Sequence, residues 1–237
     1  MSQKKNNRIL IKLSGESLMG SGNYGISIDT VNNIAASLKK LLLKKAQICI
    51  VIGGGNIFRG LEASSQGMDR ANADYMGMLA TVLNGLALQN ALEKIEAQTR
   101  VMSAFPIQSI CETYIRRRAI RHMEKNRIVI CTAGTGNPYF STDTSAALRA
   151  AELDCGVIYK ATQVDGIYDK DPKKFKNAKK YSKLSFKKYI NENLKVMDTS
   201  AIAISRDNNI PIKLFSIQEK NCFVRMYMNK LSHSEIS

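Results

Sequence analysis

The chain has 237 residues, 44% of them apolar, which is enough to bury a large core and fits one α/β domain over 1–237 with a disordered tail at 1–7. It carries 35 basic and 20 acidic side chains, a net charge of +15, and no apolar run approaches the roughly 20 residues that cross a bilayer, so we expect no membrane partner. The five cysteines are widely spaced and mostly lie in apolar runs. This usage indicates reduced core residues in a cytoplasmic protein rather than a disulfide framework or a metal site.

The predicted elements alternate strands with helices along the chain. Strands are expected at 8–13, 48–52, 99–103, 127–132, 156–161 and 210–215, with a last strand near 222–228. Helices are expected from Asp29, as the N-cap, to about Lys45, and at 71–95, 109–124, 143–153 and 199–208. The alternation predicts an α/β fold, a three-layer α/β/α sandwich with a mostly parallel central sheet.

The helix expected at 71–95 is apolar on more than one face. This pattern is typical of a helix that lies between a sheet and a neighbouring subunit. Gly77 and Gly85 each lower helix propensity by about 1 kcal/mol, and we therefore expect close packing of this helix against another element.

The stretch ICIVIGGGNIFRG, residues 48–60, joins a buried strand to three consecutive glycines and an arginine. The carboxyl edge of an open α/β sheet is where ligands lie, and glycine N–H groups can approach an anion closely. Arg59 adds a planar set of donors. The alternative for this stretch alone is an ordinary strand-to-helix turn with a surface arginine.

Two further segments follow predicted strands. AGTGNPYFSTD, residues 133–143, supplies a tight turn and then hydroxyls before a helix, which suits an anion or a base edge; an Asn-Pro turn with an N-cap at Ser141 or Thr142 is the alternative. KATQVDGIYDKDP, residues 160–172, ends a strand in Lys160 and Thr162, and a turn with a surface acidic pair explains it equally well. Together with the glycine stretch 48–60 and LSGES after the first strand, these segments make four loops that suggest two phosphorylated ligands.

GSGNYG, residues 20–25, satisfies the dinucleotide-binding spacing, but no strand runs into it and a helix begins only after Asp29. We interpret it as a flexible loop. The phosphate-binding spacing G-x-x-x-x-G-K-[ST] is absent from the sequence.

A lysine-rich segment lies between Asp169 and Tyr189. It carries a charge of +7, so about half of the net charge falls in less than a tenth of the chain. Aromatic residues are interleaved with the lysines, a mixture that can bind single-stranded nucleic acid, although a solvated lysine face is the commoner explanation.

Six ordered segments resemble those of the bacterial UMP kinases of the amino acid kinase family: KLSGES, VIGGGNIFRG, MDRANADYMGMLATVLNGLAL, AGTGNPYFSTDTSAALRAAE, KATQVDGIYDKDP and KVMD. The similarity runs from about Arg8 to Met228. It implies transfer of the ATP γ-phosphoryl group to UMP with Mg²⁺, giving UDP and ADP in pyrimidine nucleotide biosynthesis. It also implies a homohexamer that GTP activates and UTP inhibits.

The resemblance implies three groups of site residues and no metal ligand. The ATP-binding group is Lys12, Leu13, Ser14, Gly15, Gly55, Arg59, Thr162, Tyr168 and Asp171. The UMP-binding group is Gly54, Asp74, Thr135, Gly136, Asn137, Pro138, Tyr139, Phe140, Ser141 and Thr142. The loop linked to GTP activation is Gly20, Ser21, Gly22, Asn23, Tyr24 and Gly25.

Such a reaction brings two polyanions together, and like charges about 4 Å apart repel by about 4 kcal/mol at an effective dielectric near 20. Lys12, Arg59, Lys160 and Mg²⁺ are expected to offset that repulsion. Asp143 is expected to complete the catalytic group. We expect Asp143 and Asp198 to orient lysines or metal-bound water, with an N-cap role as the alternative for Asp198.

Two other functions remain open from the sequence. One is a different phosphotransferase of the same fold that makes an acyl phosphate or carbamoyl phosphate, against which the nucleotide-suited loop 133–143 argues. The other is a basic nucleic-acid-binding protein, either instead of catalysis or beside it.

Overall fold

The structure is a computed structural model that describes residues 7–172 and 174–237, so residues 1–6 of the expected disordered tail and Lys173 of the lysine-rich segment lie outside the described part. Strands are β1 (Arg8–Leu13), β2 (Gln47–Ile52), β3 (Thr99–Ser103), β4 (Glu112–Thr113), β5 (Ile128–Thr132), β6 (Val157–Thr162), β7 (Ile167–Tyr168), β8 (Lys180–Tyr181), β9 (Lys183–Leu184), β10 (Ile212–Ser216) and β11 (Ser234–Ile236). Helices are η1 (Gly15–Leu18), α2 (Ile28–Leu42), α3 (Gly60–Ser65), α4 (Arg70–Lys94), α5 (Arg116–Glu124), α6 (Thr142–Glu152), α7 (Phe186–Asn191), α8 (Thr199–Asp207) and α9 (Cys222–Tyr227).

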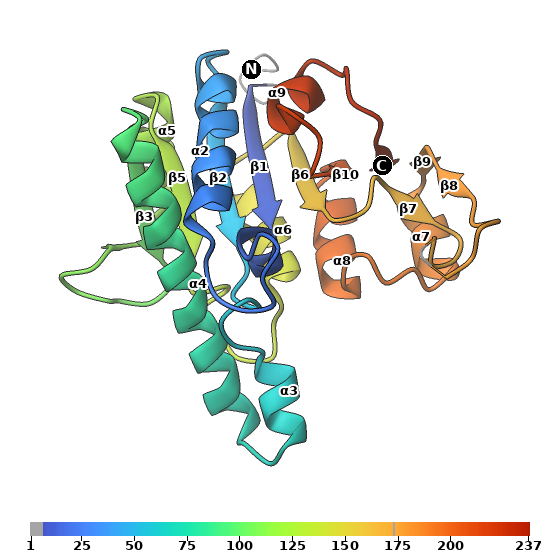
Figure 1. Cartoon of the computed structure of the whole chain (residues 1–237), viewed down its shortest axis with the longest axis horizontal. Helices are drawn as coiled ribbons and strands as arrows, with labels where there is room; N and C mark the ends of the chain where they lie inside the picture. The colour runs from blue at the N-terminus through green and yellow to red at the C-terminus, as the bar shows by residue number, and fades with distance from the viewer. Residues whose placement is uncertain (1–6, 173) are drawn as a thin grey trace.

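A large sheet forms the middle of the molecule (Figure 1). Its strand order is β4-β3-β5-β2-β1-β6-β10-β11-β9, and the recorded pairs are parallel except for β10 with β11. The central strands are buried on both faces, as their continuous apolar runs predict. Since β1, β2, β5 and β6 are parallel, the loops that follow them meet at one edge of the sheet.

Helices cover both faces of this sheet and make three layers. On one face α2, α4 and α9 pack over Ile9, Ile11 and Leu13 of β1. On the other face α5, α6, α7 and α8 pack over strand residues that include Leu10. Side chains alternate along a strand, so Lys12 belongs to the same face as Leu10.

Helix α4 contains the two glycines that predict close packing. A Cβ atom on Gly85 would lie 2.5 Å from Thr132 Cγ2 in β5, which confirms the prediction for that position. A Cβ atom on Gly77 would meet nothing within 4 Å, so no neighbouring atom requires glycine at that position. The close approach at Gly77 involves its carbonyl oxygen, which would lie 2.6 Å from a Cβ atom on Gly54.

The strands predicted near 8–13, 48–52, 99–103, 127–132, 156–161 and 210–215 are confirmed to within two residues at each end. Three other predictions are wrong. The helix expected at 109–124 begins only at Arg116, because Glu112 and Thr113 pair with the end of β3 as an edge strand. The strand expected near 222–228 is helix α9, and Ser27 rather than Asp29 caps α2 by accepting from Thr30 N.

The five cysteines are free thiols, and Cys49, Cys131, Cys155 and Cys222 are buried, as the sequence predicts. Among the helices of residues 7–172 and 174–237, none combines the length and apolar character that crossing a bilayer requires.

The contrast between the two glycines of α4 predicts opposite effects of alanine. Gly85→Ala should lower the free energy of unfolding by about 1–3 kcal/mol, because the added methyl group overlaps Thr132. Gly77→Ala should raise it by about 0.5–1 kcal/mol, because the position is open and alanine favours a helix. Urea denaturation of both variants tests this, and a shift of both in the same direction would contradict it.

Candidate active site

Lys12 and Lys160 are neighbours because β1 and β6 pair in parallel register. Their Cα atoms are register partners, and both side chains lie on the α6 side of the sheet. Both residues are buried, at 7% and 8% relative exposure. Two like charges side by side in a sheet repel each other, so the arrangement needs an anion between them.

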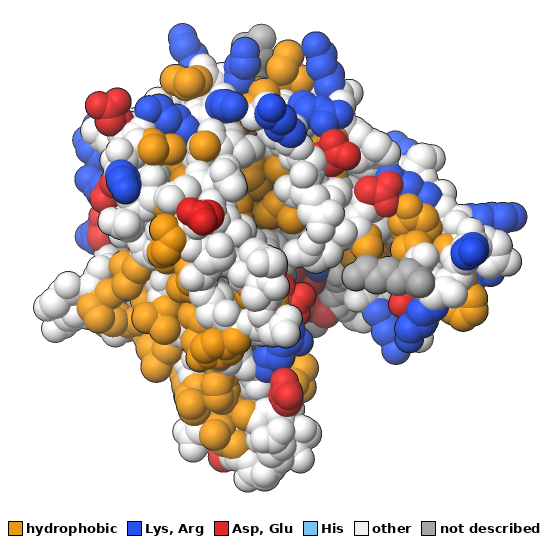
Figure 2. Space-filling model, viewed as in Figure 1, with side chains coloured by type: hydrophobic (Ala, Val, Ile, Leu, Met, Phe, Trp, Pro, Cys, Tyr) orange, Lys and Arg blue, Asp and Glu red, His pale blue; other side chains and the backbone are white. Residues whose placement is uncertain are grey.

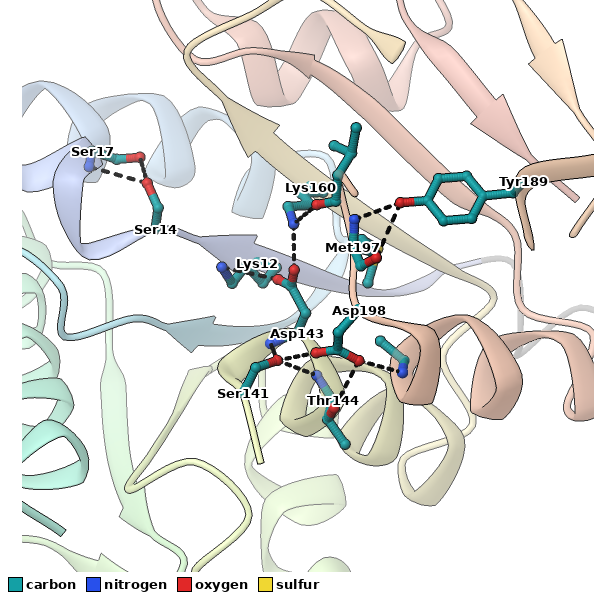
Figure 3. Close-up of polar contacts among 12 residues, drawn as sticks. Lys12, Ser14, Ser17, Ser141, Asp143, Thr144, Lys160, Tyr189, Met197 and Asp198 are labelled. Carbon is teal, nitrogen blue, oxygen red and sulfur yellow. Dashed lines mark hydrogen bonds and ion pairs between the residues drawn. The ribbon is translucent and has the colours of Figure 1, made fainter. Parts of the chain in front are cut away.

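Asp143, in the first turn of α6, supplies that anion (Figure 3). Its Oδ1 lies 3.0 Å from Lys12 Nζ, and its Oδ2 accepts a hydrogen bond from Lys160 Nζ. Lys160 also donates to the carbonyl of Val196, which fixes the direction of its ammonium group. The two lysines and the carboxylate together carry a charge of +1 and can attract a further anion.

Burial and charge oppose each other at Asp143. Burial alone would raise the pKa of its carboxyl, but Lys12 and Lys160 outweigh burial and hold that pKa below the ordinary value. Burial lowers the pKa of the Lys160 ammonium, and Asp143 only partly offsets this. The Asp143 carboxyl is therefore ionised at neutral pH and offsets one of the two lysine charges.

Asp198 is the N-cap of α8, the alternative that the sequence left open for it. One carboxylate oxygen accepts from Ala201 N at 2.7 Å and from Thr144 Oγ1 at 2.9 Å, and the other accepts from Ser141 Oγ. Ser141 in turn caps α6 by accepting from the N–H groups of Asp143 and Thr144. These bonds join the starts of α6 and α8 and so set the position of Asp143.

Two glycine turns approach each other at the ends of β1 and β2. A Cβ atom on Gly15 would lie 2.7 Å from Gly55 N, and one on Gly53 would lie 3.0 Å from Gly15 N, so only glycine fits at this crossing. Gly53 N donates to Leu13 O. In the described part of the chain, the N–H groups of Gly54 and Gly55 have no hydrogen-bond partner, which leaves two donors for an anion.

The residues that flank these turns contribute in different ways. Ser14 caps η1 by accepting from Ser17 N. Leu13 is fully buried toward α2, so only its backbone reaches the edge. The Arg59 side chain is 53% exposed, donates from Nε to Gly55 O at 3.2 Å and forms an ion pair with Glu16, so its guanidinium lies beside the glycine turn.

A cavity of about 580 Å³ opens next to these turns. Its lining includes Arg59, Asp74, Tyr139, Phe140, Ser141 and Asp198. A smaller adjoining space of about 130 Å³ is lined by Gly54, Asp74, Phe140 and Thr142 among others. Gly54 and Thr142 therefore face a common space, and the combined volume is of the size that small-molecule sites have.

The loop over this cavity is tied to α4 by Asp74. Asp74 Oδ2 accepts from Tyr139 N at 2.7 Å and from Arg70 Nε at 2.8 Å, and Tyr139 has a φ of 71°. The first half of the predicted loop, Thr135, Gly136, Asn137 and Pro138, forms a turn in which Thr135 Oγ1 accepts from Asn137 N. The second half, from Tyr139 to Thr142, faces the cavities.

The remaining predicted ATP residues lie beyond β6. Thr162 ends β6 two residues after Lys160 and accepts from Val164 N. Tyr168, in β7, donates to Asp165 at 2.7 Å, and the Asp171 carbonyl accepts from Lys174 N and Phe175 N. The contacts of Thr162 with Val164 and of Tyr168 with Asp165 are local in the sequence, and Thr162 lies close to Lys160 through its place at the end of β6.

The segment 20–25 is a loop, as the sequence predicts. Tyr24 is 73% exposed, while Gly25 N donates to Asn56 O at 2.8 Å. Asn56 and its buried partner Asn84 were not predicted as site residues from the sequence. The feature that could have indicated them is Asn84, a polar residue within the apolar run of α4.

The lysine-rich segment is partly neutralised in the fold. Lys180 pairs with Asp165 at 2.8 Å, Lys183 with Glu235 at 3.4 Å and Lys188 with Glu192 at 3.6 Å. Figure 2 shows lysine and arginine side chains at the right, where Figure 1 places β8 and α7, and others along the top of the same view. Its role as a nucleic-acid surface stays a prediction.

Paired lysines, a carboxylate between them and free glycine N–H groups at the carboxyl edge of a parallel sheet define a phosphotransferase. Comparison with known proteins identifies the family of phosphotransferases to which the chain belongs. The model of the amino acid kinase family matches residues 7–216, and the chain belongs to that family.

The relatives and structural neighbours carry consistent names. A uridylate kinase of Zymomonas mobilis is 56% identical over 93% of this chain and 91% of its own, and one of Rickettsia bellii is 52% identical over 99% and 98%. The crystal structure of a UMP kinase from Ureaplasma parvum superposes with a TM-score of 0.93 at 40% identity and covers 98% of both chains.

Asp143→Asn should lower the free energy of unfolding at pH 7 by about 3 kcal/mol, because two buried ammonium groups lose their counter-charge. The folded pKa of Asp143 is lowered, so its contribution is present above the ordinary value of 3.8 and is lost as pH falls through the folded value. The difference between wild type and variant should therefore shrink below about pH 4. Urea denaturation at several pH values measures it.

The exposed ion pair of Asp154 with Arg116, 2.9 Å apart, gives the control. Asp154→Asn should cost about 0–1 kcal/mol at pH 7. Equal effects of the two substitutions would contradict the special role of Asp143.

Proposed function

We propose that the protein is a UMP kinase, which transfers the γ-phosphoryl group of ATP to UMP in pyrimidine nucleotide biosynthesis. The observation that carries the proposal is the Lys12–Asp143–Lys160 cluster beside the glycine N–H groups and next to a cavity of about 580 Å³. The names of the relatives support UMP as the acceptor.

In this reaction an oxygen of the UMP phosphate attacks the γ-phosphorus of ATP, a new O–P bond forms, and the bond to the β-phosphate oxygen breaks to release ADP. The UMP phosphate is already ionised, so no strong base is required. Lys12, Lys160 and Arg59 offset the charge of the two nucleotides, and the N–H groups of Gly54 and Gly55 bind oxygens of the transferred group. Asp143 orients the two lysines.

Different loops would bind the two nucleotides. Lys12, Ser14, Gly15, Gly55 and Arg59 would hold the ATP phosphates, and Thr162, Tyr168 and Asp171 the adenosine. Asp74 would bind the ribose hydroxyls of UMP, and the loop from Thr135 to Thr142 would enclose the nucleotide. Because Asp74 already accepts from Tyr139 N, one carboxylate both contacts UMP and holds the loop over it.

Mg²⁺ would accompany ATP. Within the described residues no cluster of three or more His, Cys, Asp or Glu side chains could hold a metal, and Asp143 is engaged by two lysines. This donor set fits a metal that arrives on the nucleotide, since Mg²⁺ is commonly held by phosphate oxygens and water with few protein ligands. Bound there, Mg²⁺ would neutralise charge on the β- and γ-phosphates.

Regulation, assembly and location complete the proposal. The loop Gly20–Gly25 would respond to GTP, and UTP would inhibit. The assembly would be a homohexamer. Self-association in general is supported by apolar side chains exposed along α4, among them Tyr75, Met76, Leu79 and Leu83, in a region that Figure 2 shows as largely hydrophobic. A cytoplasmic location accords with the free cysteines.

Incubation of the purified protein with ATP, Mg²⁺ and a panel of UMP, CMP, dTMP and amino acid acceptors tests the substrate. We expect UMP to be consumed fastest. Lys12→Ala should abolish turnover and keep the fold, which ties the activity to this site. A preference for a carboxylate acceptor would overturn the proposal, and retention of activity within a few-fold by Lys12→Ala would remove Lys12 from the transition state.

Asp74→Asn should mainly raise the KM for UMP and leave the KM for ATP nearly unchanged, because the carboxylate lines the acceptor cavity. Steady-state kinetics with ATP and UMP varied separately measure both constants. Equal increases in the two would place Asp74 elsewhere in the reaction.

A further inference from the structure

Asn56 and Asn84 form a buried pair of amides beneath the glycine turn. Their relative exposures are 2% and 0%. Asn56 directly follows Gly55, and Asn84 lies in the middle of α4. A buried amide is costly unless its hydrogen-bonding groups are satisfied, so the bonds of this pair indicate what it does.

All four amide hydrogens of the pair have acceptors. Asn84 Nδ2 donates to Asn56 Oδ1 at 2.6 Å and to Gly53 O at 2.7 Å. Asn56 Nδ2 donates to Asn84 Oδ1 at 2.9 Å and to Gly25 O at 2.8 Å. Because both donors and both oxygens are engaged, the pair has one well-defined arrangement.

The bond to Gly53 O fixes one peptide plane of the glycine turn. The described chain has no cis peptide bond, so the N–H of Gly54 points opposite to the carbonyl of Gly53. With that carbonyl held by Asn84 of α4, the Gly54 N–H is directed away from α4. This is one of the two N–H groups that have no partner among the described residues.

Asn56 also contacts the turn after β1 and the loop 20–25. A Cβ atom on Gly15 would lie 2.4 Å from Asn56 Oδ1, and Gly25 N donates to Asn56 O at 2.8 Å. The pair therefore touches Gly53, Gly15 and Gly25, which belong to three separate loops at the edge of the sheet.

We propose that Asn56 and Asn84 are positioning residues for phosphoryl transfer. They hold the Gly53–Gly54 peptide, and hence the Gly54 N–H, in the orientation that binds the transferred group. This inference rests on the function proposed above. Glycine has no side chain that could fix the orientation of its own peptide group. Without the asparagine pair, the peptides of the glycine turn can therefore adopt several orientations.

The test compares Asn84→Ala with wild type at a temperature where both are fully folded. We expect kcat with saturating ATP and UMP to fall about tenfold or more, since a small displacement of a group that binds the transferred phosphoryl can cost about 100-fold, while the KM for UMP stays within about threefold. Asn56→Ala should act in the same direction. Asn90→Ala, exposed on the same helix, is the matched control and should keep kcat within about twofold.

Retention of kcat by Asn84→Ala within about twofold, or a loss that only follows the folded fraction measured by urea denaturation, would overturn the inference. Should Asn84→Ala fail to fold, Asn84→Ser and Asn56→Ala take its place with the same expectation. If wild type prefers another acceptor, the same comparison is made with that acceptor, so failure of the proposed substrate and failure of the positioning role are distinguishable.

Discussion

The charge balance among Lys12, Lys160 and Asp143 is the constraint on which the site depends. Parallel register places two ammonium groups side by side, and at about 4 Å their repulsion would be about 4 kcal/mol at an effective dielectric near 20. The carboxylate relieves this only if the start of α6 is held in place. Ser141 and Asp198 provide that support, so two helix caps serve an electrostatic purpose.

The two faces of the sheet contribute different groups to the site. The face covered by α6 and α8 provides the charged groups, and the face covered by α4 provides the buried amides and Asp74. The glycine turn lies between them and has no side chains of its own. Its geometry is therefore determined from both sides, by helices that are far apart in the sequence.

Much of this arrangement could be predicted from the sequence. Apolar runs and periodicity identified the central strands and the long helices, and three consecutive glycines after a buried strand located the edge of the sheet where the glycine turns and the two lysines lie. The period of two along β1 even assigns Lys12 to one face. Local patterns carry this information because strand burial and helix amphipathicity repeat over many residues.

The wrong predictions, and the contacts that were not predicted, depend on packing between elements rather than on local patterns. Residues 222–228 are apolar enough for a strand, but Cys222, Phe223 and Met226 are buried at helical spacing against the face of the sheet that α2 and α4 also cover. The edge strand β4 exists only because β3 offers unpaired groups to it. The contact of Asp143 with both lysines, and that of Asn84 with Gly53, depend on packing between distant segments, which no local pattern reports.

Helix α4 is a single rod of 25 residues, about 37 Å long. Asp74 lies in its first turns, Asn84 lies in its middle, and Figure 1 shows its first turns extending past the edge of the sheet together with α3. A rigid rod moves as a whole, so a tilt imposed on its projecting end would shift the loop 135–142, which Asp74 holds, and the glycine turn, which Asn84 holds, by linked amounts. This coupling needs no further chain of contacts through the core, because Asp74 and Asn84, which hold the loop and the turn, belong to the same helix.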